Sequence, residues 1–419
     1  MSVYIKKGIC SGSVKVPPSK SLSHRVLLAS FLSKSKCKIS NLLLCDDTIA
    51  TMGIMKSLGK EIIEENDEFI ISGDKFNYDG VILNANESGS TLRFIIPILS
   101  LFPGSFKITG TKKLLSRPLD IYKKIYNEQG LLFNLTDEYL EVSGKLISGE
   151  YVVPGNISSQ FITGLLYTLP LLDGDSRIVI TEKFESKSYV DMTLDVLKKF
   201  GIVITLESEN VYFIKGNQEY KACDITVEGD YSQMAFWSVL GTINNDLKIE
   251  GMNEYSLQGD SEIVNILDKY AGNIKYANDS YYVSKNKISK MEIDLSMIPD
   301  LGPILAVLCC SNNEYSVIKN CYRLKYKESD RLEAIKEELL KMNIDVKVID
   351  DTLMVKNKGE IYNTEIIDSH NDHRIFMALA ILGTISENGV RIDNEGCINK
   401  SYPNFLNDLI NVGIKVEYE

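Results

Sequence analysis

The sequence predicts an α/β protein built from six similar units. The chain has 419 residues, of which 44% are hydrophobic and 25% charged, the composition of a globular protein too large for a single core. A polar turn followed by a strongly apolar helical stretch occurs six times. Amphipathic helices and alternating strands fill the intervals between these stretches. The length by itself favours two or three domains.

Each unit begins with a short strand-like segment, which leads into a turn rich in Ser, Asp, Asn or Gly and then into the apolar run. The separations between successive units are 67, 70, 74, 66 and 74 residues, so six units account for the chain. The runs are apolar on nearly all sides, which is typical of helices buried inside a domain. The units begin at Val16, Leu83, Val153, Val227, Ile293 and Ile367.

The segments between the apolar runs predict the rest of each unit. Glycine ends two of the amphipathic patterns, and this residue commonly stops a helix. Alternation of apolar and polar residues is typical of half-buried strands. Each unit is therefore expected to run strand, buried helix, strand, amphipathic helix, strand, strand. The predicted amphipathic helices are 119–130, 192–201 and 331–342, and predicted strands include 202–206, 211–214 and 344–348.

The charge balance excludes several classes of partner. With 46 basic and 57 acidic residues the net charge is −11, which argues against nucleic acid and against anionic membranes. The longest nearly apolar runs, 94–102 and 375–382, fall short of the roughly 18 residues that span a bilayer. The first residues lack the apolar stretch of a signal peptide, so we expect a cytoplasmic protein. An anionic substrate would require a local basic cluster.

The cysteines and the known nucleotide motifs indicate no metal and no cofactor. The eight cysteines contain no CxxC pair and no Cys/His grouping at zinc spacing. We expect buried thiols in a reducing compartment. HExxH, Walker A and GxGxxG patterns are also missing from the sequence.

Several basic residues stand where helix physics disfavours them. Lys20 and Arg25 open the first apolar helix, Arg93 opens the second and Arg374 opens the last. The helix dipole opposes cations at an N-terminus and favours anions there. A local rule broken in three of six units indicates function, and the simplest account is that multivalent anions bind near these helix ends.

Two other helix starts allow a structural interpretation beside the functional one. Ser158, Ser159 and Gln160 open the third apolar helix and offer a donor set suited to phosphate or carboxylate. One of the two serines is equally suited to cap the helix. Asp300 precedes a helix of Leu, Ile and Val, and a cap and a functional carboxylate are both open for it.

Two groups of charged residues are candidates for a site. Residues 325–331 lie where a strand-like stretch meets a helix; a solvated surface is the usual explanation for such a run, but sites also form at these junctions. Residues 371–374 (Asn-Asp-His-Arg) contain one of only three histidines, which is either structural or functional. The charged residues of the first group are Lys325, Lys327, Glu328, Asp330 and Arg331.

Nine segments occur in an order and at a spacing that point to one family: PPSKSLSHR, ESGSTLR, LLSRPLD, ISSQF, SKSYVDMT, IPDLG, KESDRL, NDHR and CINKSYP. Along essentially its full length the chain resembles the 5-enolpyruvylshikimate-3-phosphate (EPSP) synthase family. The resemblance implies two similar domains, each of three βαβαββ units with buried parallel helices, and a cleft between the domains. It places one domain at 1–17 plus 228–419 and the other at 18–227.

The reaction that the resemblance implies answers the question raised by the net charge. This family transfers the enolpyruvyl group of phosphoenolpyruvate to the 5-hydroxyl of shikimate-3-phosphate and releases phosphate, by addition and elimination. Both substrates are small anions, and helix N-termini with Lys and Arg neutralise them without a metal. The implied protein is a monomer with no cofactor and no macromolecular partner. The discontinuous domain would carry the general acid and base and part of the phosphoenolpyruvate site, and the other domain part of the shikimate-3-phosphate site.

The matching positions imply roles for individual residues. The resemblance assigns catalysis to Lys20, Asp300 as the base and Glu328 as the acid. It assigns shikimate-3-phosphate binding to Lys20, Ser21, Arg25, Ser158, Ser159, Gln160, Ser186, Tyr189, Asp300 and Lys327. It assigns phosphoenolpyruvate binding to Lys20, Gly89, Arg93, Arg117, Gln160, Arg331, Arg374 and Lys400.

Three positions depart from the family pattern. Glu87 and His24 stand where Asn is expected, and Arg323 stands where an Asn contacts substrate, so these three are left out of the site.

The sister family acting on UDP-N-acetylglucosamine commonly carries a Cys in the loop matching residues 111–120, which has none here. A non-catalytic scaffold would have no use for clustered buried charge.

Overall fold

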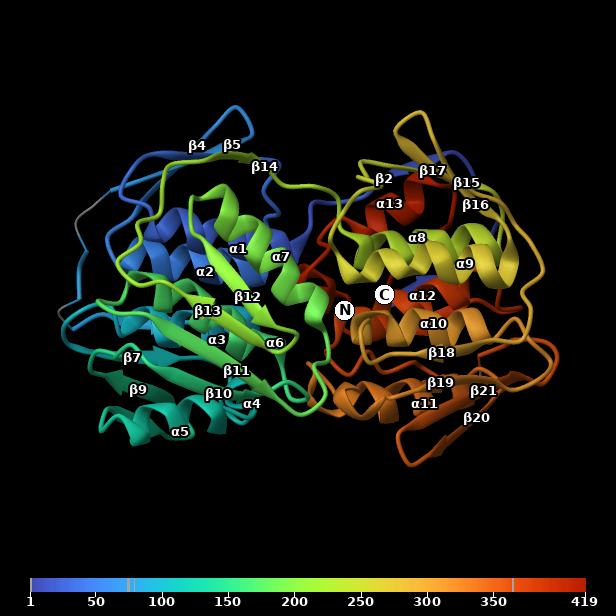
Figure 1. Cartoon of the computed structure of the whole chain (residues 1–419). Helices are drawn as coiled ribbons and strands as arrows, with labels where there is room; N and C mark the ends of the chain where they lie inside the picture. Colours follow the sequence, from blue (N-terminus) through green and yellow to red (C-terminus); the bar gives the residue numbers. More distant parts are fainter. Residues whose placement is uncertain (1, 74–75, 79, 364) are drawn as a thin grey trace. The chain divides into compact units, whose positions relative to one another are not determined.

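The chain forms two compact units, each with its own hydrophobic core. The computed structural model describes residues 2–73, 76–78, 80–363 and 365–419. Unit 1 consists of Met1–Pro17 with Glu228–Glu419, and unit 2 of Pro18–Val227 (Figure 1). Among the described residues, every helix is too short or too polar to cross a membrane.

The described part of unit 2 contains three four-stranded sheets with one common pattern. In each sheet the first two strands pair in parallel, and the other pairs are antiparallel. In spatial order the sheets are β14 (Asp224–Thr226), β3 (Cys37–Ser40), β5 (Glu68–Ser72) and β4 (Glu61–Glu65); β6 (Ile82–Asn84), β7 (Ser105–Thr109), β9 (Tyr139–Ser143) and β8 (Leu132–Leu135); and β10 (Glu150–Pro154), β11 (Ser176–Thr181), β13 (Val211–Ile214) and β12 (Ile204–Ser208).

The described part of unit 1 repeats this pattern twice and modifies it once. Its third sheet has three strands, and an isolated parallel bridge between Ile367 and Ile392 supplies the remaining pairing. In spatial order the sheets are β16 (Ile274–Ala277), β17 (Ser280–Val283), β15 (Leu247–Glu250) and β2 (Ser13–Lys15); β18 (Glu292–Asp294), β19 (Ser316–Lys319), β21 (Thr352–Asn357) and β20 (Ile344–Ile349); and β22 (Val390–Ile392), β1 (Val3–Ile5) and β23 (Val416–Tyr418).

The six apolar runs form six helices, which confirms the predicted α/β fold. Every residue of α8, α10 and α12 is buried, because these helices lie inside unit 1 (Figure 1). The apolar runs are α1 (Lys20–Leu32), α3 (Gly89–Leu99), α6 (Ser159–Thr168), α8 (Tyr231–Ile243), α10 (Gly302–Cys309) and α12 (His373–Gly383). The other helices are α2 (Asp46–Ser57), α4 (Lys112–Leu115), α5 (Asp120–Glu128), α7 (Lys187–Lys199), α9 (Glu262–Ala271), α11 (Arg331–Lys341) and α13 (Phe405–Asn411). The short 3₁₀ helices are η1 (Leu169–Leu171), η2 (Gly259–Ser261), η3 (Pro299–Leu301), η4 (Tyr322–Tyr326) and η5 (Glu395–Lys400).

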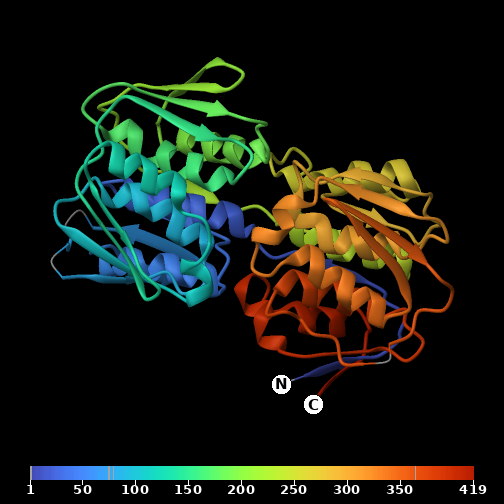
Figure 2. The same cartoon turned by 90° about the horizontal axis from the view of Figure 1, so that it is seen from below.

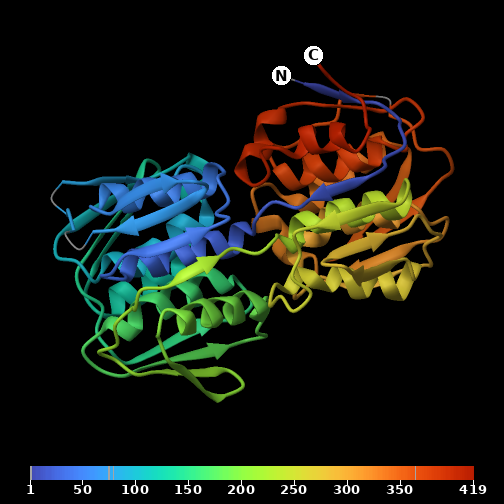
Figure 3. The same cartoon turned by 90° about the horizontal axis from the view of Figure 1, so that it is seen from above.

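The strands next to the unit boundaries pair far from their sequence neighbours. β2 precedes α1 but pairs with β15 of unit 1, whereas β14 precedes α8 but pairs with β3 of unit 2. β1 lies between β22 and β23, so the two ends of the chain run side by side (Figures 2 and 3). The first residues therefore complete a sheet formed by the last ones.

Close packing of α3 against α6 positions one part of the candidate site. A Cβ on Gly164 of α6 would lie 2.8 Å from the Arg93 carbonyl oxygen and 2.3 Å from the Tyr122 hydroxyl. The Tyr122 hydroxyl donates to the carbonyls of Arg93 at 2.8 Å and Phe161 at 3.1 Å. The missing side chain at Gly164 thus lets α3 and α6 approach each other closely.

Candidate active site

Lys20 begins α1, one of the predicted positions where a cation stands at a helix N-terminus. Its ammonium donates to the Asp47 carboxylate at 2.9 Å, and the two side chains are 15% and 13% exposed. Asp47 lies in the first turn of α2, where the helix dipole favours an anion. The pair therefore holds a cation at the start of α1 against the unfavourable dipole. Asp47 was not predicted from the sequence.

Arg25 lies one turn further along α1 and is buried. It donates to the carbonyls of Ser21 at 2.7 Å and Tyr189 at 2.9 Å, and to the Thr193 hydroxyl at 2.9 Å. Burial lowers the pKa of the Arg25 guanidinium, and the nearby tyrosines oppose this. Because Arg25 joins α1 to α7, it brings Ser21 and Tyr189 into one neighbourhood.

The first turns of α3 and α6 meet through Arg93 and Gln160. Arg93 Nη1 donates to Gln160 Oε1 at 2.7 Å, and Gln160 Nε2 donates to the Ser90 hydroxyl at 3.0 Å. Arg117 reaches the same place, because a Cβ on Gly89 would lie 2.6 Å from Arg117 Nη1. Two guanidinium groups and the N-terminus of α3 thus converge, which is an arrangement that favours anions.

The predicted serines occupy helix N-termini. Ser158 caps α6, since its hydroxyl accepts from the Gln160 backbone N–H at 3.3 Å, so the capping interpretation is correct for this serine. Ser159 follows it and is buried. Ser186 precedes α7 with a left-handed φ of 54°, and its carbonyl accepts from the Tyr189 N–H at 3.1 Å. A non-glycine residue in this conformation is held there by its surroundings.

The three departures from the family pattern have different surroundings. His24 is buried in α1 with Nδ1 2.9 Å from the Thr51 hydroxyl, and the Thr51 and Thr91 hydroxyls lie 2.7 Å apart. Burial lowers the pKa of His24 well below its usual value, with Lys20 and Arg25 acting in the same direction, so the ring is neutral. Glu87 is partly buried before α3, and Arg323 is buried in η4 of unit 1.

Unit 1 contains a dense ionic cluster around Asp300 and Arg331. Asp300 Oδ1 accepts from Lys327 Nζ at 3.0 Å and from Arg331 Nη1 at 3.1 Å, and its Oδ2 accepts from Arg374 Nη2 at 3.2 Å. Arg331 Nη2 also donates to Glu328 Oε2 at 2.6 Å. A solvated surface therefore does not explain the whole run 325–331, because Lys327, Glu328 and Arg331 belong to this cluster. Asp300 does not cap α10 either, because Leu301 occupies that position without a side-chain cap bond.

Asp372, which belongs to the candidate group 371–374 but received no role of its own from the sequence, completes this cluster. Its fully buried carboxylate accepts from Arg331 Nε at 2.7 Å, from the Ser329 hydroxyl at 3.0 Å and from the Arg374 backbone N–H at 2.9 Å. The Asp372 carboxylate therefore has two roles: it caps α12, and it holds the Arg331 guanidinium in place. Lys400 joins the same segment by donating from Nζ to the Asn371 carbonyl at 2.6 Å.

The charges of the cluster control the pKa values of its members. Burial raises the pKa of Asp300, but Arg374, Lys327 and Arg331 outweigh it and hold this pKa well below the usual range. Burial also raises the pKa of Asp372, but Arg331 brings it down to about 2. For Lys327, burial prevails and lowers the pKa. Asp300 and Asp372 are therefore carboxylates at neutral pH.

Asp260 behaves in the opposite way. It is buried in η2 and accepts from the Ser232 hydroxyl. Burial raises its pKa to about 7, with the charge of Asp300 adding to this and Arg374 opposing it. Among the described residues its Oδ1 has no hydrogen-bond partner. Asp260 is thus a buried carboxyl group that holds its proton close to neutral pH.

Replacement of this group should stabilise the protein in alkaline solution. Above pH 4 the Asp260 side chain loses its proton in the unfolded chain, whereas in the folded chain it keeps the proton up to about pH 7. The free energy of unfolding therefore falls as pH rises between these two values. We expect Asp260→Asn to raise the free energy of unfolding at pH 8 by up to about 4 kcal/mol, at ~1.4 kcal/mol per pH unit, and to have little effect at pH 4. Urea unfolding at both pH values measures this. Asp268→Asn, at an exposed position of α9, is the control; an equal gain at both pH values would contradict the prediction.

The comparison with known sequences decides the family. The profile of the family described as EPSP synthase (3-phosphoshikimate 1-carboxyvinyltransferase) matches residues 6–409. The chain belongs to the EPSP synthase family. It is 43% identical over 415 residues to the 3-phosphoshikimate 1-carboxyvinyltransferase of Clostridium novyi, covering 96% of this chain and 95% of that protein. It is 40% identical over 430 residues to that of Clostridioides difficile, covering 100% and 98%.

Solved structures agree with the fold. EPSP synthase from Acinetobacter baumannii superposes with a TM-score of 0.81 at 22% identity and full coverage of both chains. The enolpyruvyl transferase NikO from Streptomyces tendae superposes with a TM-score of 0.80 at 15% identity, covering 100% of this chain and 98% of that one. These likenesses confirm the EPSP synthase fold predicted from the nine segments.

Within each unit the structure brings the predicted residues together. In unit 2 the predicted residues form two hydrogen-bonded groups, one around Arg25 and one around Arg93. Lys20 lies at the start of α1, paired with Asp47. In unit 1 Asp300 links Lys327, Arg331 and Arg374, and Lys400 contacts the segment before α12. Asp47, which the sequence did not point to, and Asp372, which was a candidate without an assigned role, are the anionic partners of predicted cations.

Proposed function

We propose that the chain transfers the enolpyruvyl group of phosphoenolpyruvate to the 5-hydroxyl of shikimate-3-phosphate and releases inorganic phosphate. The carrying observation is the cluster in which Lys327, Arg331 and Arg374 all contact Asp300, in a protein whose net charge is −11. The cations of this cluster are shared with the carboxylates of Asp300, Glu328 and Asp372, and multivalent substrate anions compete with these carboxylates for them.

Phosphoenolpyruvate is bound by cations at helix N-termini. In unit 2 its phosphate is held by Arg93 and Arg117, with Gly89 permitting close approach of the backbone. In unit 1 Arg331, Arg374 and Lys400 hold its carboxylate and phosphate, and Asp372 fixes the Arg331 guanidinium. Lys20 and Gln160 contact the same substrate.

Shikimate-3-phosphate is bound by hydroxyl donors and cations. Hydroxyl groups at helix N-termini are suited to phosphate oxygens, and Arg25 joins two of the helices concerned, α1 and α7. Lys327 contacts this phosphate from unit 1, beside Asp300. The residues in this role are Lys20, Ser21, Arg25, Ser158, Ser159, Gln160, Ser186, Tyr189, Asp300 and Lys327.

Two carboxyl groups move the protons. Glu328 delivers a proton to the methylene carbon of phosphoenolpyruvate, while Asp300 takes the proton of the 5-hydroxyl and the hydroxyl oxygen bonds to the enol carbon. Elimination then breaks the bond between this tetrahedral carbon and the phosphate oxygen. The methyl group formed in the addition returns a proton to the Glu328 carboxylate, which restores the double bond, and Asp300 passes its proton to the leaving phosphate. Asp300 is a weak base while three cations contact it. Substrate anions that engage Lys327 and Arg374 would reduce this effect and raise the pKa of Asp300 toward that of a useful base.

The test is phosphate release. We expect release with phosphoenolpyruvate plus shikimate-3-phosphate, and none above background with phosphoenolpyruvate plus UDP-N-acetylglucosamine. Either substrate alone serves as the blank. Release with the nucleotide sugar only would assign the chain to the sister activity, and no release in any mixture would contradict the proposed transfer.

The cellular location and the oligomeric state of the protein stay predictions. All eight cysteines are free thiols, and seven of them are buried, which supports the proposed cytoplasmic location. The monomeric state follows only from the family resemblance, and equilibrium sedimentation would test it.

A further inference from the structure

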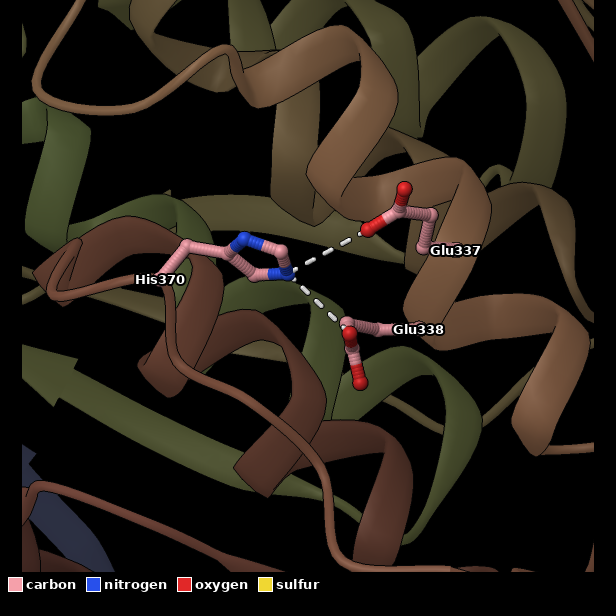
Figure 4. A group of neighbouring side chains, drawn as sticks. All are labelled: Glu337, Glu338 and His370. Carbon is pink, nitrogen blue, oxygen red and sulfur yellow. Dashed lines mark hydrogen bonds and ion pairs between the residues drawn. The ribbon is translucent and has the colours of Figure 1, made fainter.

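His370 lies against two glutamates of α11, although neither the sequence pattern nor the proposed chemistry uses it. Figure 4 shows the ring of His370 directed toward Glu337 and Glu338. His370 Nε2 lies 3.0 Å from Glu338 Oε1 and 3.9 Å from Glu337 Oε2. Glu338 is 1% exposed and Glu337 51%, so the contact with Glu338 is the buried one. This contact joins α11 to the segment that precedes α12.

Glu338 is the anchor of that segment. Besides His370, its carboxylate accepts from the Asp368 backbone N–H at 3.1 Å and from Lys341 Nζ at 2.8 Å to both oxygens. The three ligand atoms of Glu337, Glu338 and His370 lie within 4.8 Å of one another, as a metal site would require. The ammonium of Lys341 already supplies the positive charge that Glu338 needs, so the contacts support an anchoring role.

The anchored segment has an unusual backbone. His370 and Asn371 both adopt a left-handed φ of 52°. Two successive non-glycine residues in this region persist only where the surroundings hold them. Further bonds hold the segment: Asp368 Oδ1 accepts from the His370 N–H at 2.6 Å, and Asp393 Oδ1 accepts from the Ser369 N–H at 2.7 Å.

This backbone delivers two groups to the ionic cluster of unit 1. The carbonyl of Asn371 accepts from Lys400, and the next residue, Asp372, binds Arg331 and caps α12. On α11, Arg331 and Glu338 are seven residues apart and so lie on the same side of the helix. The segment 368–372 is thus fastened to α11 at two places, by Asp372 at one end and by His370 and Asp368 at the other.

We propose that His370 is a positioning residue of this cluster. Through Glu338 it holds segment 368–372 in the left-handed conformation that presents Asp372 to Arg331 and the Asn371 carbonyl to Lys400. Its effect on catalysis rests on the proposed function, in which these two cations bind phosphoenolpyruvate. Its effect on the segment itself does not.

The contact between His370 and Glu338 depends on pH. The charged groups that act on the ring are Glu337 and Glu338 on α11 and Asp368 in the segment itself. Of the other charged groups nearby, Lys341 on α11 pairs with Glu338, and Asp393 accepts from the Ser369 N–H. The hydrogen bond to Glu338 raises the pKa of His370 and burial opposes it, while Asp368, Glu338 and Glu337 add to the rise. The imidazolium is therefore present below the raised pKa. As pH rises through this value the ring loses its charge, and the tie to Glu338 weakens.

The experiment compares His370→Ala with His370→Gln, whose amide keeps a donor in reach of Glu338. Hydrogen exchange of amides 369–374 and steady-state phosphate release are measured on the full chain. In His370→Ala we expect local exchange to rise about tenfold, and kcat/KM for phosphoenolpyruvate to fall roughly 10- to 100-fold, mainly through KM. His370→Gln should restore most of both quantities. Its protection factors at amides 369–374, from which the intrinsic base catalysis of exchange is already divided out, should lose the pH dependence that those of the unaltered protein show.

Glu337→Gln is the matched control, because it alters the exposed neighbour of His370, and both readouts should stay within twofold of the unaltered protein. If His370→Ala behaves like this control, the proposal is wrong. If His370→Ala does not fold, Glu338→Gln decides: local exchange rising at 369–374 supports the proposal, and unchanged exchange overturns it. If the unaltered protein releases no phosphate, the proposed function fails while hydrogen exchange still decides the role of His370.

Discussion

Arg331→Met is expected to reduce the free energy of unfolding by about 3–5 kcal/mol at pH 8. Arg331 is 1% exposed and donates to three carboxylates, those of Asp300, Glu328 and Asp372. Methionine fills a similar volume but leaves the buried Asp372 carboxylate without its principal cation. The loss is the cost of an uncompensated buried charge, and no substrate needs to be present for it to appear.

The size of this loss should depend on pH. With Arg331 in place the pKa of Asp372 is about 2, below its ordinary value, so the stabilisation from this pair is present above pH 4 and is lost as pH falls toward 2. Without Arg331, burial alone would raise the pKa of Asp372, and protonation would remove the buried charge. The difference between the two proteins should therefore be smaller at pH 4.5 than at pH 8.

Urea unfolding at the two pH values checks this, with Lys336→Met as the matched control. Lys336 lies on the same helix and pairs with Glu333 at the surface, where ion pairs contribute about 0–1 kcal/mol. A loss below about 1 kcal/mol in Arg331→Met, or one that does not change with pH, would show that the cluster tolerates unpaired carboxylates.

The six apolar helices were predictable because their signal is local. Each follows a polar turn and is apolar on nearly all sides, and the structure buries all or most of each helix. The cations at the starts of α1, α3 and α12 were also predictable, because they break a rule that involves only their own helix.

Partners that lie far apart in the sequence could not be predicted from the residues alone. Asp300 contacts Lys327, Arg331 and Arg374, which are 27, 31 and 74 residues away, and a helix cap was an equally good interpretation of its local sequence. Asp47 is 27 residues from Lys20 and carries no signal beyond a good position in the first turn of α2.

The pairing of strands is non-local in the same way. β2 and β14 each stand directly before a buried helix, and a prediction from order alone would pair them within that helix's own unit. The structure pairs β2 with β15 and β14 with β3 instead. The boundaries of the two units, at 17/18 and 227/228, follow from this exchange.

Lys20→Met is expected to abolish measurable turnover, a fall of about 10²–10³-fold or more in kcat, while the fold stays intact. Lys20 contacts both substrates in the proposed function, and its charge has no replacement at the start of α1. Its loss leaves Asp47 in the first turn of α2, where the helix dipole still stabilises the carboxylate. The free energy of unfolding should therefore change by only about 1 kcal/mol. Arg117→Ala, which removes the guanidinium beside Gly89, should have the same kinetic effect.

Phosphate release and urea unfolding on the same preparations separate catalysis from stability. Lys199→Met is the matched control, because Lys199 also pairs with one aspartate, Asp195 at 2.7 Å, but lies at the far end of α7. It should keep the turnover of the unaltered protein. Rates near that level in Lys20→Met or Arg117→Ala would refute the roles assigned to these cations. Turnover lost together with the fold would mean that the Lys20–Asp47 pair is structural, because the dipole of α2 would then be too weak to hold Asp47 alone.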